Sequence, residues 1–390
     1  MHSWITGMPP TMKLKSEGFA SSLSEPTGRF TLGAYCASNG IPYQDTGLPV
    51  GVKTFIDYGQ EFQRRFAPNL EQTNALSVRR SARGFDVELE HGQKLSVERI
   101  VVASGIMEYA SVPDALTSLP SDVCTHSGFY ANLRYLPGQR IAIVGAGSSA
   151  MDMAAFLKQQ GLDVIVIARR PVVRFQTPLG SRSVVEKLRA PMTTIGPGWK
   201  SVLCTHAPLV FHSMPTAFRV DVVRRYLGPA PAWFTREAVE GRVPIITDAT
   251  VGEAAMENGR VRLRIDKGHA EPLVVVVDRV IAATGYRVDV DRLSFLDREI
   301  RLAIRRDDCA PRLSMDFQSS VPGLYFVGTA SANSFGPMLR FACGAGFAAR
   351  RVARYLKATR IPKPYIPGVP SQQNPLYLKP DSAAVARRHS

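Results

Sequence analysis

Three small residues, Gly145, Gly147 and Ala150, have the spacing G-x-G-x-x-A of a loop that binds the pyrophosphate of a dinucleotide. Gly145 permits a tight turn, Gly147 leaves room for backbone amides to approach a phosphate, and Ala150 lets helix and strand pack closely. Ser148 and Ser149 lie in the same turn, where the N-terminus of a helix favours negative charge. We therefore expect these five residues to bind a nucleotide; the alternative is a tight turn with a purely structural role.

The elements around this loop are those that such a site requires. Ile141–Val144 is a short continuous apolar run, typical of a strand buried on both faces of a parallel sheet. Apolar residues then recur at helical spacing over Ser148–Gln159, Gly161 is placed to end that helix, and Val164–Ile167 reads as a second buried strand. The stretch 140–170 thus predicts a complete βαβ unit.

The end of the second strand indicates which nucleotide is bound. An NAD-binding fold usually places an Asp or Glu here, on the ribose hydroxyl, whereas this chain has Arg169 and Arg170. Two guanidinium groups suit a 2′-phosphate, so the sequence favours NADPH. The alternative is that both arginines lie on a solvated loop.

A degenerate internal repeat predicts a second nucleotide-binding sheet. A hairpin and then the run Arg99–Gly105, ending in Ala-Ser-Gly, is followed much later by a second hairpin and Arg279–Gly285, ending in Ala-Thr-Gly. Ser104, Gly105, Thr284 and Gly285 are therefore further candidates for cofactor contact. Only the second copy has a G-x-G-x-x-A unit upstream, so the first nucleotide domain lacks its opening unit.

Other segments give simpler predictions. Residues 1–30 read as a loop, whereas Thr31–Ser38 and Val52–Phe66 read as helices, the latter with an aromatic stripe that we interpret as core. Leu324–Val327 predicts a buried strand that ends at Gly328. A helix is expected to begin near Gly336, with Pro337 in its first turn.

The segment that follows Arg170 is rich in Pro, Gly and aromatic residues, and we expect a helical cap over the site or an interface there. His206 and His212 lie in it without the spacing of a metal motif, which favours structural roles over ligation. Beyond Ile361 the chain is Pro-rich and basic, as in a surface tail.

Composition limits the class of protein. The chain has 390 residues and a net charge of +15, but its arginines are spread in pairs, so nucleic-acid binding is a minor hypothesis. The five cysteines form neither a C-x-x-C pair nor a metal-ligand pattern, and we predict no metal site. With no signal peptide and no apolar run that could span a membrane, we expect a soluble, cytoplasmic protein that does not bind membranes.

The order of ASG, GAGSSAMD, VIAATGY and GLYFVGTASANSFGP resembles the two-dinucleotide flavoproteins, in particular the flavin-dependent monooxygenases and the lysine/ornithine N-hydroxylases. The resemblance implies an α/β fold with two Rossmann-like, three-layer dinucleotide-binding domains, the NADPH domain being inserted in the FAD domain. The implied boundaries are 1–118 for the first FAD segment, which is N-terminally incomplete, 119–290 for the NADPH domain with a helical insertion at about 172–238, 291–360 for the second FAD segment, and 361–390 for the tail.

The same resemblance implies an NADPH-dependent flavoprotein oxidoreductase, a monooxygenase that passes hydride from NADPH to FAD and oxygen from dioxygen to a small nucleophilic substrate such as an amine. Gly328, Gly336 and Pro337 would lie by the flavin and its ribityl chain. Two family motifs are not matched: the N-terminal GxGxxG loop for FAD, and the FxGxxxH fingerprint, where only His126-Ser127 corresponds. The alternative is a truncated relative that binds NADPH but no flavin and is inactive or sensory. The sequence identifies no catalytic acid or base, and it leaves a homo-oligomer open.

Overall fold

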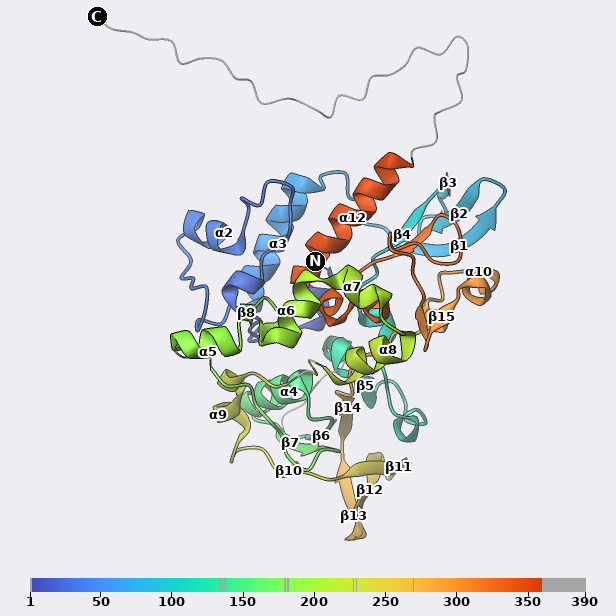
Figure 1. Cartoon of the computed structure of the whole chain (residues 1–390). Helices are drawn as coiled ribbons and strands as arrows, with labels where there is room; N and C mark the ends of the chain where they lie inside the picture. The colour runs from blue at the N-terminus through green and yellow to red at the C-terminus, as the bar shows by residue number, and fades with distance from the viewer. Residues whose placement is uncertain are drawn as a thin grey trace, which may run out of the picture.

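A five-stranded parallel sheet organises the lower half of the molecule in Figure 1. Its strand order is β10 (Ile245–Ile246), β7 (Asp163–Ile167), β6 (Arg140–Val144), β14 (Arg279–Ala282) and β5 (Cys124–His126). The structure, a computed structural model, describes residues 2–132, 135, 138–178, 180, 182–226, 228, 230–268 and 270–359. The βαβ prediction is confirmed, with α4 spanning Ser148–Gln159 between β6 and β7.

This sheet is the middle of three layers. Because side chains alternate along a strand, Ile141 and Ile143 of β6 pack with α4, whereas Ala142 and Val144 face an antiparallel sheet on the other side. That sheet consists of β11 (Thr250–Glu257), β12 (Arg260–Lys267) and β13 (Ala270–Val277). The four side chains Ile141–Val144 are all buried, which explains the unbroken apolar run in the sequence.

A second, smaller parallel sheet is also packed beside an antiparallel sheet. It pairs β4 (Ile100–Val102) with β17 (Leu324–Phe326), and a second antiparallel sheet lies beside it, made of β1 (Ala75–Ser81), β2 (Gly84–Leu89) and β3 (Lys94–Val97). The predicted internal repeat is therefore confirmed. Within the described part of the chain this parallel sheet has two strands, against five in the other.

The N-terminal helices pack around aromatic side chains. Helices α2 (Leu32–Ser38) and α3 (Val52–Phe66) lie where the sequence predicts them, and Thr31 caps α2 by accepting a hydrogen bond from the Ala34 amide at 3.1 Å. Phe55 and Tyr58 of α3 are buried in a common cluster, which confirms the core interpretation of the aromatic stripe. The loop prediction for residues 1–30 is incomplete, because α1 (His2–Gly7) forms one short helix there.

The long segment after β7 folds into short helices. They are α5 (Val184–Arg189), α6 (Trp199–His206), α7 (Pro208–Ser213), α8 (Thr216–Arg225) and α9 (Arg236–Val239). We call α5–α8 the insertion. It lies between β7 and β10 of the five-stranded sheet in sequence, yet Cys204 of α6 belongs to the core around β4 and β17, and α7 contacts α11, the helix that follows β17. The insertion therefore joins the two halves of the molecule (Figure 1).

The C-terminal region departs from the sequence prediction. Gly336 has a φ of +98° and ends α11 (Ala332–Phe335); only one 3-10 turn, Pro337–Arg340, follows before the chain bends again. The long helix α12 begins later, at Ala345, and ends at Ala358. The expected helix start is confirmed only in part: a helical turn does begin at Pro337 with Gly336 as its N-cap, but it is a 3-10 turn that ends at Arg340, and the long helix starts eight residues later than Pro337. The predicted tail from 361 lies outside the described residues.

The remaining elements are short. They are α10 (Arg298–Ala303), the two-residue pair β8 (Met192–Thr193) and β9 (Gly196–Pro197), and the pair β15 (Arg306–Asp307) and β16 (Ala310–Pro311). Among the described helices, none combines the length and the apolar character that crossing a bilayer would require.

Candidate functional site

The loop between β6 and α4 has the geometry of a phosphate-binding turn. Gly145 adopts a φ of +139°, and a Cβ atom placed on it would lie 2.3 Å from the carbonyl oxygen of Ala283. Its amide donates a hydrogen bond of 2.9 Å to the Ile167 carbonyl, which fixes the turn against β7. Only glycine fits this position, because both the backbone angle and the close approach exclude a side chain.

The first turn of α4 leaves a polar atom without a protein partner. The Ser148 hydroxyl oxygen is buried and forms no hydrogen bond with any described residue. Buried polar atoms are normally satisfied, so an orphan at a helix N-terminus fits a site whose partner is a bound anion. Ser149, Arg169 and Arg170 are exposed beside this turn and at the end of β7. These residues fit the phosphates of a dinucleotide.

Three glycines in the left-handed backbone region mark the carboxyl ends of other parallel strands. Gly105 follows β4, Gly285 follows β14 and Gly328 follows β17, with φ values of +76°, +83° and +66°. A Cβ atom on any of them would meet no heavy atom within 4 Å. In open α/β sheets ligands bind outside the carboxyl ends of the strands, and these glycines leave that edge open.

Two linkers, one between β4 and β5 and one after β14, run antiparallel and connect the smaller fold with the five-stranded sheet. The Ser111 amide donates to the Gly285 carbonyl at 2.9 Å, and the Arg287 amide donates to the Tyr109 carbonyl at 2.8 Å. The Thr284 hydroxyl also donates to the Ser111 carbonyl. This double linker brings Ser104 and Gly105 into the same region of the molecule as Thr284 and Gly285.

Tyr109 and Ser104 belong to the first of these linkers. Burial raises the pKa of Tyr109 to about 12, and its hydrogen bond with Ser104 opposes that shift. The phenol therefore stays protonated near neutral pH and is a hydrogen-bond donor rather than a base.

His126, at the end of β5, anchors the second linker. Its Nδ1 accepts a hydrogen bond of 3.1 Å from the Gly128 amide, so its Nε2 carries the proton and donates to the Gly285 carbonyl at 2.9 Å. The ring also packs edge-on against Tyr286, with centroids 4.9 Å apart. Burial lowers the pKa of His126, the Gly285 bond opposes this shift, and Arg292 adds to it. The imidazole is therefore neutral and has a positioning role.

We expect His126→Phe to cost about 1–3 kcal/mol of unfolding free energy, because it leaves the Gly128 amide without its partner and removes one of the two hydrogen bonds to the Gly285 carbonyl, the other being that from Ser111. The pKa of His126 is lower in the folded chain than in the unfolded chain. As the pH falls through 6.5, the unfolded chain therefore binds a proton on this imidazole that the folded chain does not, and the wild type should lose stability. The difference between wild type and variant should therefore shrink on acidification. Urea unfolding across this pH range measures it, with the exposed His91→Phe as control; a pH-independent difference would contradict the assignment.

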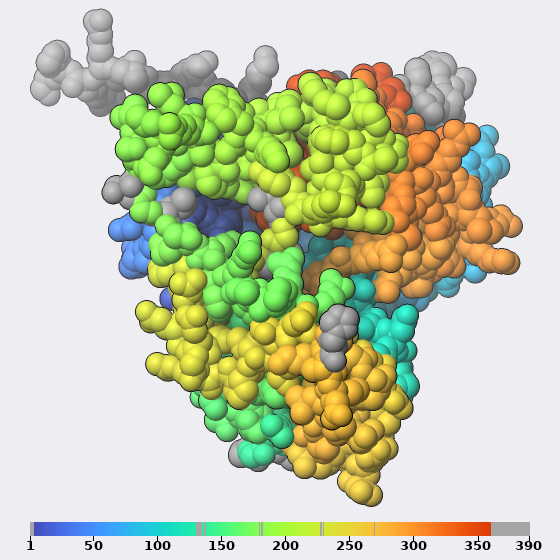
Figure 2. Space-filling model, turned by 60° about the horizontal axis from the view of Figure 1, so that its bottom comes forward, coloured from blue at the N-terminus to red at the C-terminus, as the bar shows by residue number. Residues whose placement is uncertain are grey.

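The N-terminal segment packs on α4 beside the insertion. Lys15 forms an ion pair with Asp152 of α4, and its Nζ lies 5.7 Å from the centroid of the Phe234 ring. Burial raises the pKa of Asp152, while Lys15 acts in the opposite direction. Figure 2 shows a hollow between the insertion and the larger nucleotide fold, with dark blue N-terminal residues visible inside it. This hollow is the candidate cleft.

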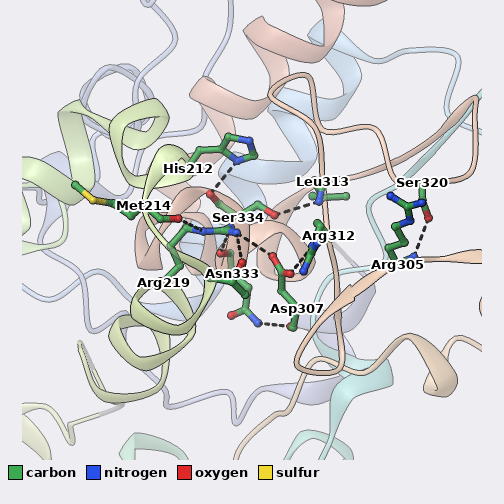
Figure 3. Close-up of polar contacts among 11 residues, drawn as sticks. His212, Met214, Arg219, Arg305, Asp307, Arg312, Leu313, Ser320, Asn333 and Ser334 are labelled. Carbon is green, nitrogen blue, oxygen red and sulfur yellow. Dashed lines mark hydrogen bonds and ion pairs between the residues drawn. The ribbon is translucent and has the colours of Figure 1, made fainter.

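A buried polar cluster attaches the insertion to the smaller fold (Figure 3). Arg219 of α8 donates to the Asp307 carboxylate at 3.0 Å, and its guanidinium also donates to the Asn333 carbonyl at 2.7 Å. Arg312 pairs with the other Asp307 oxygen at 2.6 Å. The Asp307 side chain is fully buried and that of Arg219 is 7% exposed. These contacts fix the insertion above the segment that follows Gly328.

Other candidate residues have structural surroundings. Gly336 and Pro337 are buried, and the ring of Phe211 from α7 lies 3.4 Å from the Cβ position of Gly336. His212 donates to the Ser334 carbonyl at 3.2 Å and stacks on Phe335. Among the described residues no three potential ligands form a metal site, and all five cysteines are free thiols.

Sequence reasoning missed the pairs Lys15–Asp152 and Arg219–Asp307. Their partners are far apart in the chain and have no local pattern. The only indication in the sequence was that each is a charged residue within a segment that we expected to pack against the rest of the protein.

Comparisons with known proteins agree with this architecture. A family model described as pyridine nucleotide-disulphide oxidoreductase matches residues 49–193. The ornithine hydroxylase PvdA of Pseudomonas aeruginosa is similar in structure, with a TM-score of 0.69 and 18% identity over 91% of this chain and 88% of that one. The cadaverine monooxygenase DfoA of Erwinia amylovora, solved with FAD, has a TM-score of 0.67 and 16% identity over 96% and 90%.

A curated protein with a similar sequence is also a probable monooxygenase. The probable indole-3-pyruvate monooxygenase YUCCA3 of Arabidopsis thaliana is 26% identical over 204 residues. That match covers 49% of this chain and 44% of the relative, so the chain spans less than half the length of the curated relative. The chain has the fold of the two-dinucleotide-binding flavoproteins, the class that includes the flavin-dependent monooxygenases and the amine N-hydroxylases.

Proposed function

We propose that the protein is an NADPH-dependent flavoprotein monooxygenase that acts on a small nucleophilic substrate, of which an amine is the first candidate. The observation that carries the proposal is the orphaned Ser148 hydroxyl in the glycine loop of the larger fold, together with the open strand ends at Gly105 and Gly328 of the smaller fold, to which the double linker joins it. Two dinucleotides on one face of the molecule are what such an enzyme requires. The similarity to PvdA and DfoA supports an amine as substrate.

The chain's own residues would bind and orient the cofactors. Gly145, Gly147, Ser148, Ser149 and Ala150 would hold the NADPH pyrophosphate at the N-terminus of α4. Arg169 and Arg170 would pair with the 2′-phosphate, since both guanidinium groups are exposed at the end of β7.

FAD would lie at the carboxyl ends of β4 and β17, against Ser104, Gly105 and Gly328. The cofactors supply hydride transfer and oxygen activation, for which no side chain is suited. Thr284 and Gly285, in the second linker, would separate the two sites. Gly336 and Pro337, at the start of the 3-10 turn that follows α11, would lie by the flavin and its ribityl chain.

The insertion would cover the cleft between the two nucleotide sites. Its attachment through Asp307 and Arg219 keeps it over this region, and exclusion of water protects a reactive oxygenating cofactor. In this proposal residues 1–118 and 291–360 form the FAD domain and 119–290 the NADPH domain. Dioxygen and the small substrate are the other partners.

A second candidate function follows from the smaller sheet. Within the described residues it has two strands, and the chain carries one glycine-rich phosphate loop rather than two. These features favour an NADPH-binding protein without flavin, inactive or sensory.

The visible spectrum of the purified protein, with and without added FAD, decides between the two candidates. A flavin band together with NADPH oxidation that amines stimulate supports the monooxygenase. NADPH binding without a flavin band in either sample supports the second candidate. Absence of both NADPH and FAD binding refutes both.

We expect the double variant Arg169→Ala with Arg170→Ala to weaken NADPH binding by about 10–100-fold, because charged hydrogen bonds to a phosphate contribute about 1.5–3 kcal/mol. NADH, which lacks the 2′-phosphate, should bind the variant and the wild type equally. Fluorescence titration with both nucleotides measures the ratio. Equal losses for NADPH and NADH would mean that the arginines support the fold and not the phosphate.

A further inference from the structure

A cavity opens between the N-terminal helices α2 and α3 and shares no lining residue with the two nucleotide sites. Its volume is about 360 Å³, within the range of about 300–1,000 Å³ that small-molecule sites occupy. The loop before α2, α2 itself and the last turn of α3 form its wall, and the two helices lie side by side in Figure 1. We call it the α2–α3 cavity; its lining includes Arg29, Phe30, Tyr35, Arg65 and Phe66.

Three aromatic rings supply the apolar part of this lining. The centroid of the Phe30 ring lies 6.3 Å from that of Tyr35 and 5.7 Å from that of Phe66. Phe66 continues the aromatic stripe of α3, whose members Phe55 and Tyr58 are buried, yet it is itself 43% exposed. Aromatic rings that line a cavity in this way can stack on a planar ligand.

Arg29 supplies a positive charge that the protein leaves unpaired. Its backbone amide donates a hydrogen bond of 2.5 Å to the Glu25 carboxylate, but its guanidinium forms no hydrogen bond or ion pair with any described residue. The same carboxylate accepts hydrogen bonds from the amides of Thr27 and Phe30. The loop that carries Arg29 is therefore held in place, while its charged group is free to bind an anion.

The second arginine of the cavity, Arg65, has a different role. Its guanidinium carbon lies 4.5 Å from the centroid of the Phe30 ring, and its Nε pairs with Glu61 at 2.5 Å. Arg65 thus extends the flat wall of the cavity while its charge is compensated. Among the described residues that line the cavity none is Asp or Glu, so the charge of Arg29 leaves the lining net positive.

We propose that the α2–α3 cavity binds an aromatic carboxylate, a ligand with a planar ring system and one negative charge. Its rings would stack against Phe30 and Phe66, and its carboxylate would form a bidentate pair with Arg29. One unpaired guanidinium matches a single negative charge. Since the lining residues differ from those assigned to FAD and NADPH, the ligand binds with or without either cofactor.

Equilibrium dialysis of the full chain against 2-naphthoate tests the proposal, with two analogues as ligand controls. Decahydro-2-naphthoate keeps the carboxylate but has no aromatic ring, and 2-naphthamide keeps the rings but has no charge. The wild type should bind 2-naphthoate at a single site with a dissociation constant below about 1 mM. Each analogue should bind about 3–10-fold more weakly, because it lacks the stacking or the ion pair.

Two variants assign the binding to this cavity. Arg29→Gln should weaken 2-naphthoate binding by about 10-fold, and Phe66→Leu, which keeps an apolar side chain but removes the ring, by about 3–10-fold. Arg64→Gln is the matched control, because Arg64 also pairs with Glu61 but does not line the cavity. It should bind like the wild type. All three side chains are exposed, so the unfolding temperatures should not change.

Several results would overturn the proposal. The wild type could show no saturable binding of 2-naphthoate, or Arg29→Gln could bind it as tightly as the wild type. Equal losses in Arg29→Gln and Arg64→Gln would reduce the effect to the general positive charge of the protein. Displacement of 2-naphthoate by NADPH or FAD would place it in a nucleotide site instead.

Discussion

Gly145→Ala should abolish NADPH binding and destabilise the larger nucleotide fold. The new methyl group would lie 2.3 Å from the carbonyl oxygen of Ala283, which is backbone at the end of β14 and cannot rotate away. Strain at a φ of +139° costs about 1–3 kcal/mol, and overpacking against a fixed neighbour costs about 1–3 kcal/mol more. The loop would have to move away from the phosphate, so NADPH affinity should fall by about 100-fold or more.

Gly161→Ala is the matched control for this variant. Gly161 also has a positive φ, +78°, but no heavy atom lies within 4 Å of its Cβ position. It should show only the cost of the left-handed backbone, about 1–2 kcal/mol, and unchanged NADPH affinity. Thermal unfolding and nucleotide titration of both variants measure the difference. If the two variants behave alike, the contact with Ala283 does not decide the loop conformation.

The second large effect concerns the buried pair that attaches the insertion. Asp307→Asn should cost about 3–5 kcal/mol of unfolding free energy, because it leaves the Arg219 guanidinium buried without a counter-charge. The insertion should then loosen from the smaller fold, with faster amide hydrogen exchange in α7 and α8.

Two further variants test whether the uncompensated buried charge of Arg219 is the reason for the loss of stability. Asp291→Asn removes a carboxylate that is 58% exposed and pairs with Arg306, so its effect on stability should be much smaller. Adding Arg219→Met to Asp307→Asn should restore part of the lost stability, since it removes the uncompensated charge. Urea unfolding of the three variants gives the ranking. A double variant less stable than Asp307→Asn alone would show that Arg219 stabilises by its other hydrogen bonds.

The local parts of the site could be predicted from the sequence because their signals are local. The apolar run before Gly145 and the helical periodicity after it specify β6 and α4, and the structure has α4 at the predicted residues. The internal repeat likewise predicted both hairpin sheets. Gly336 shows the limit, since the glycine and proline do mark the start of a helical turn, as the sequence predicts, but they do not show that this turn stops at Arg340 and that the long helix begins only at Ala345.

The sequence by itself determined the two nucleotide folds, the glycine loop and the arginines that follow β7, because each depends on neighbours in the chain and on an alternation or helical repeat that strands and helices impose. Tertiary structure alone decided that the insertion packs on the smaller fold, that Asp307 meets Arg219, and that His126 holds Gly285. These contacts join residues 88 and 159 positions apart, and buried charges and imidazoles have no periodic pattern that would identify their partners.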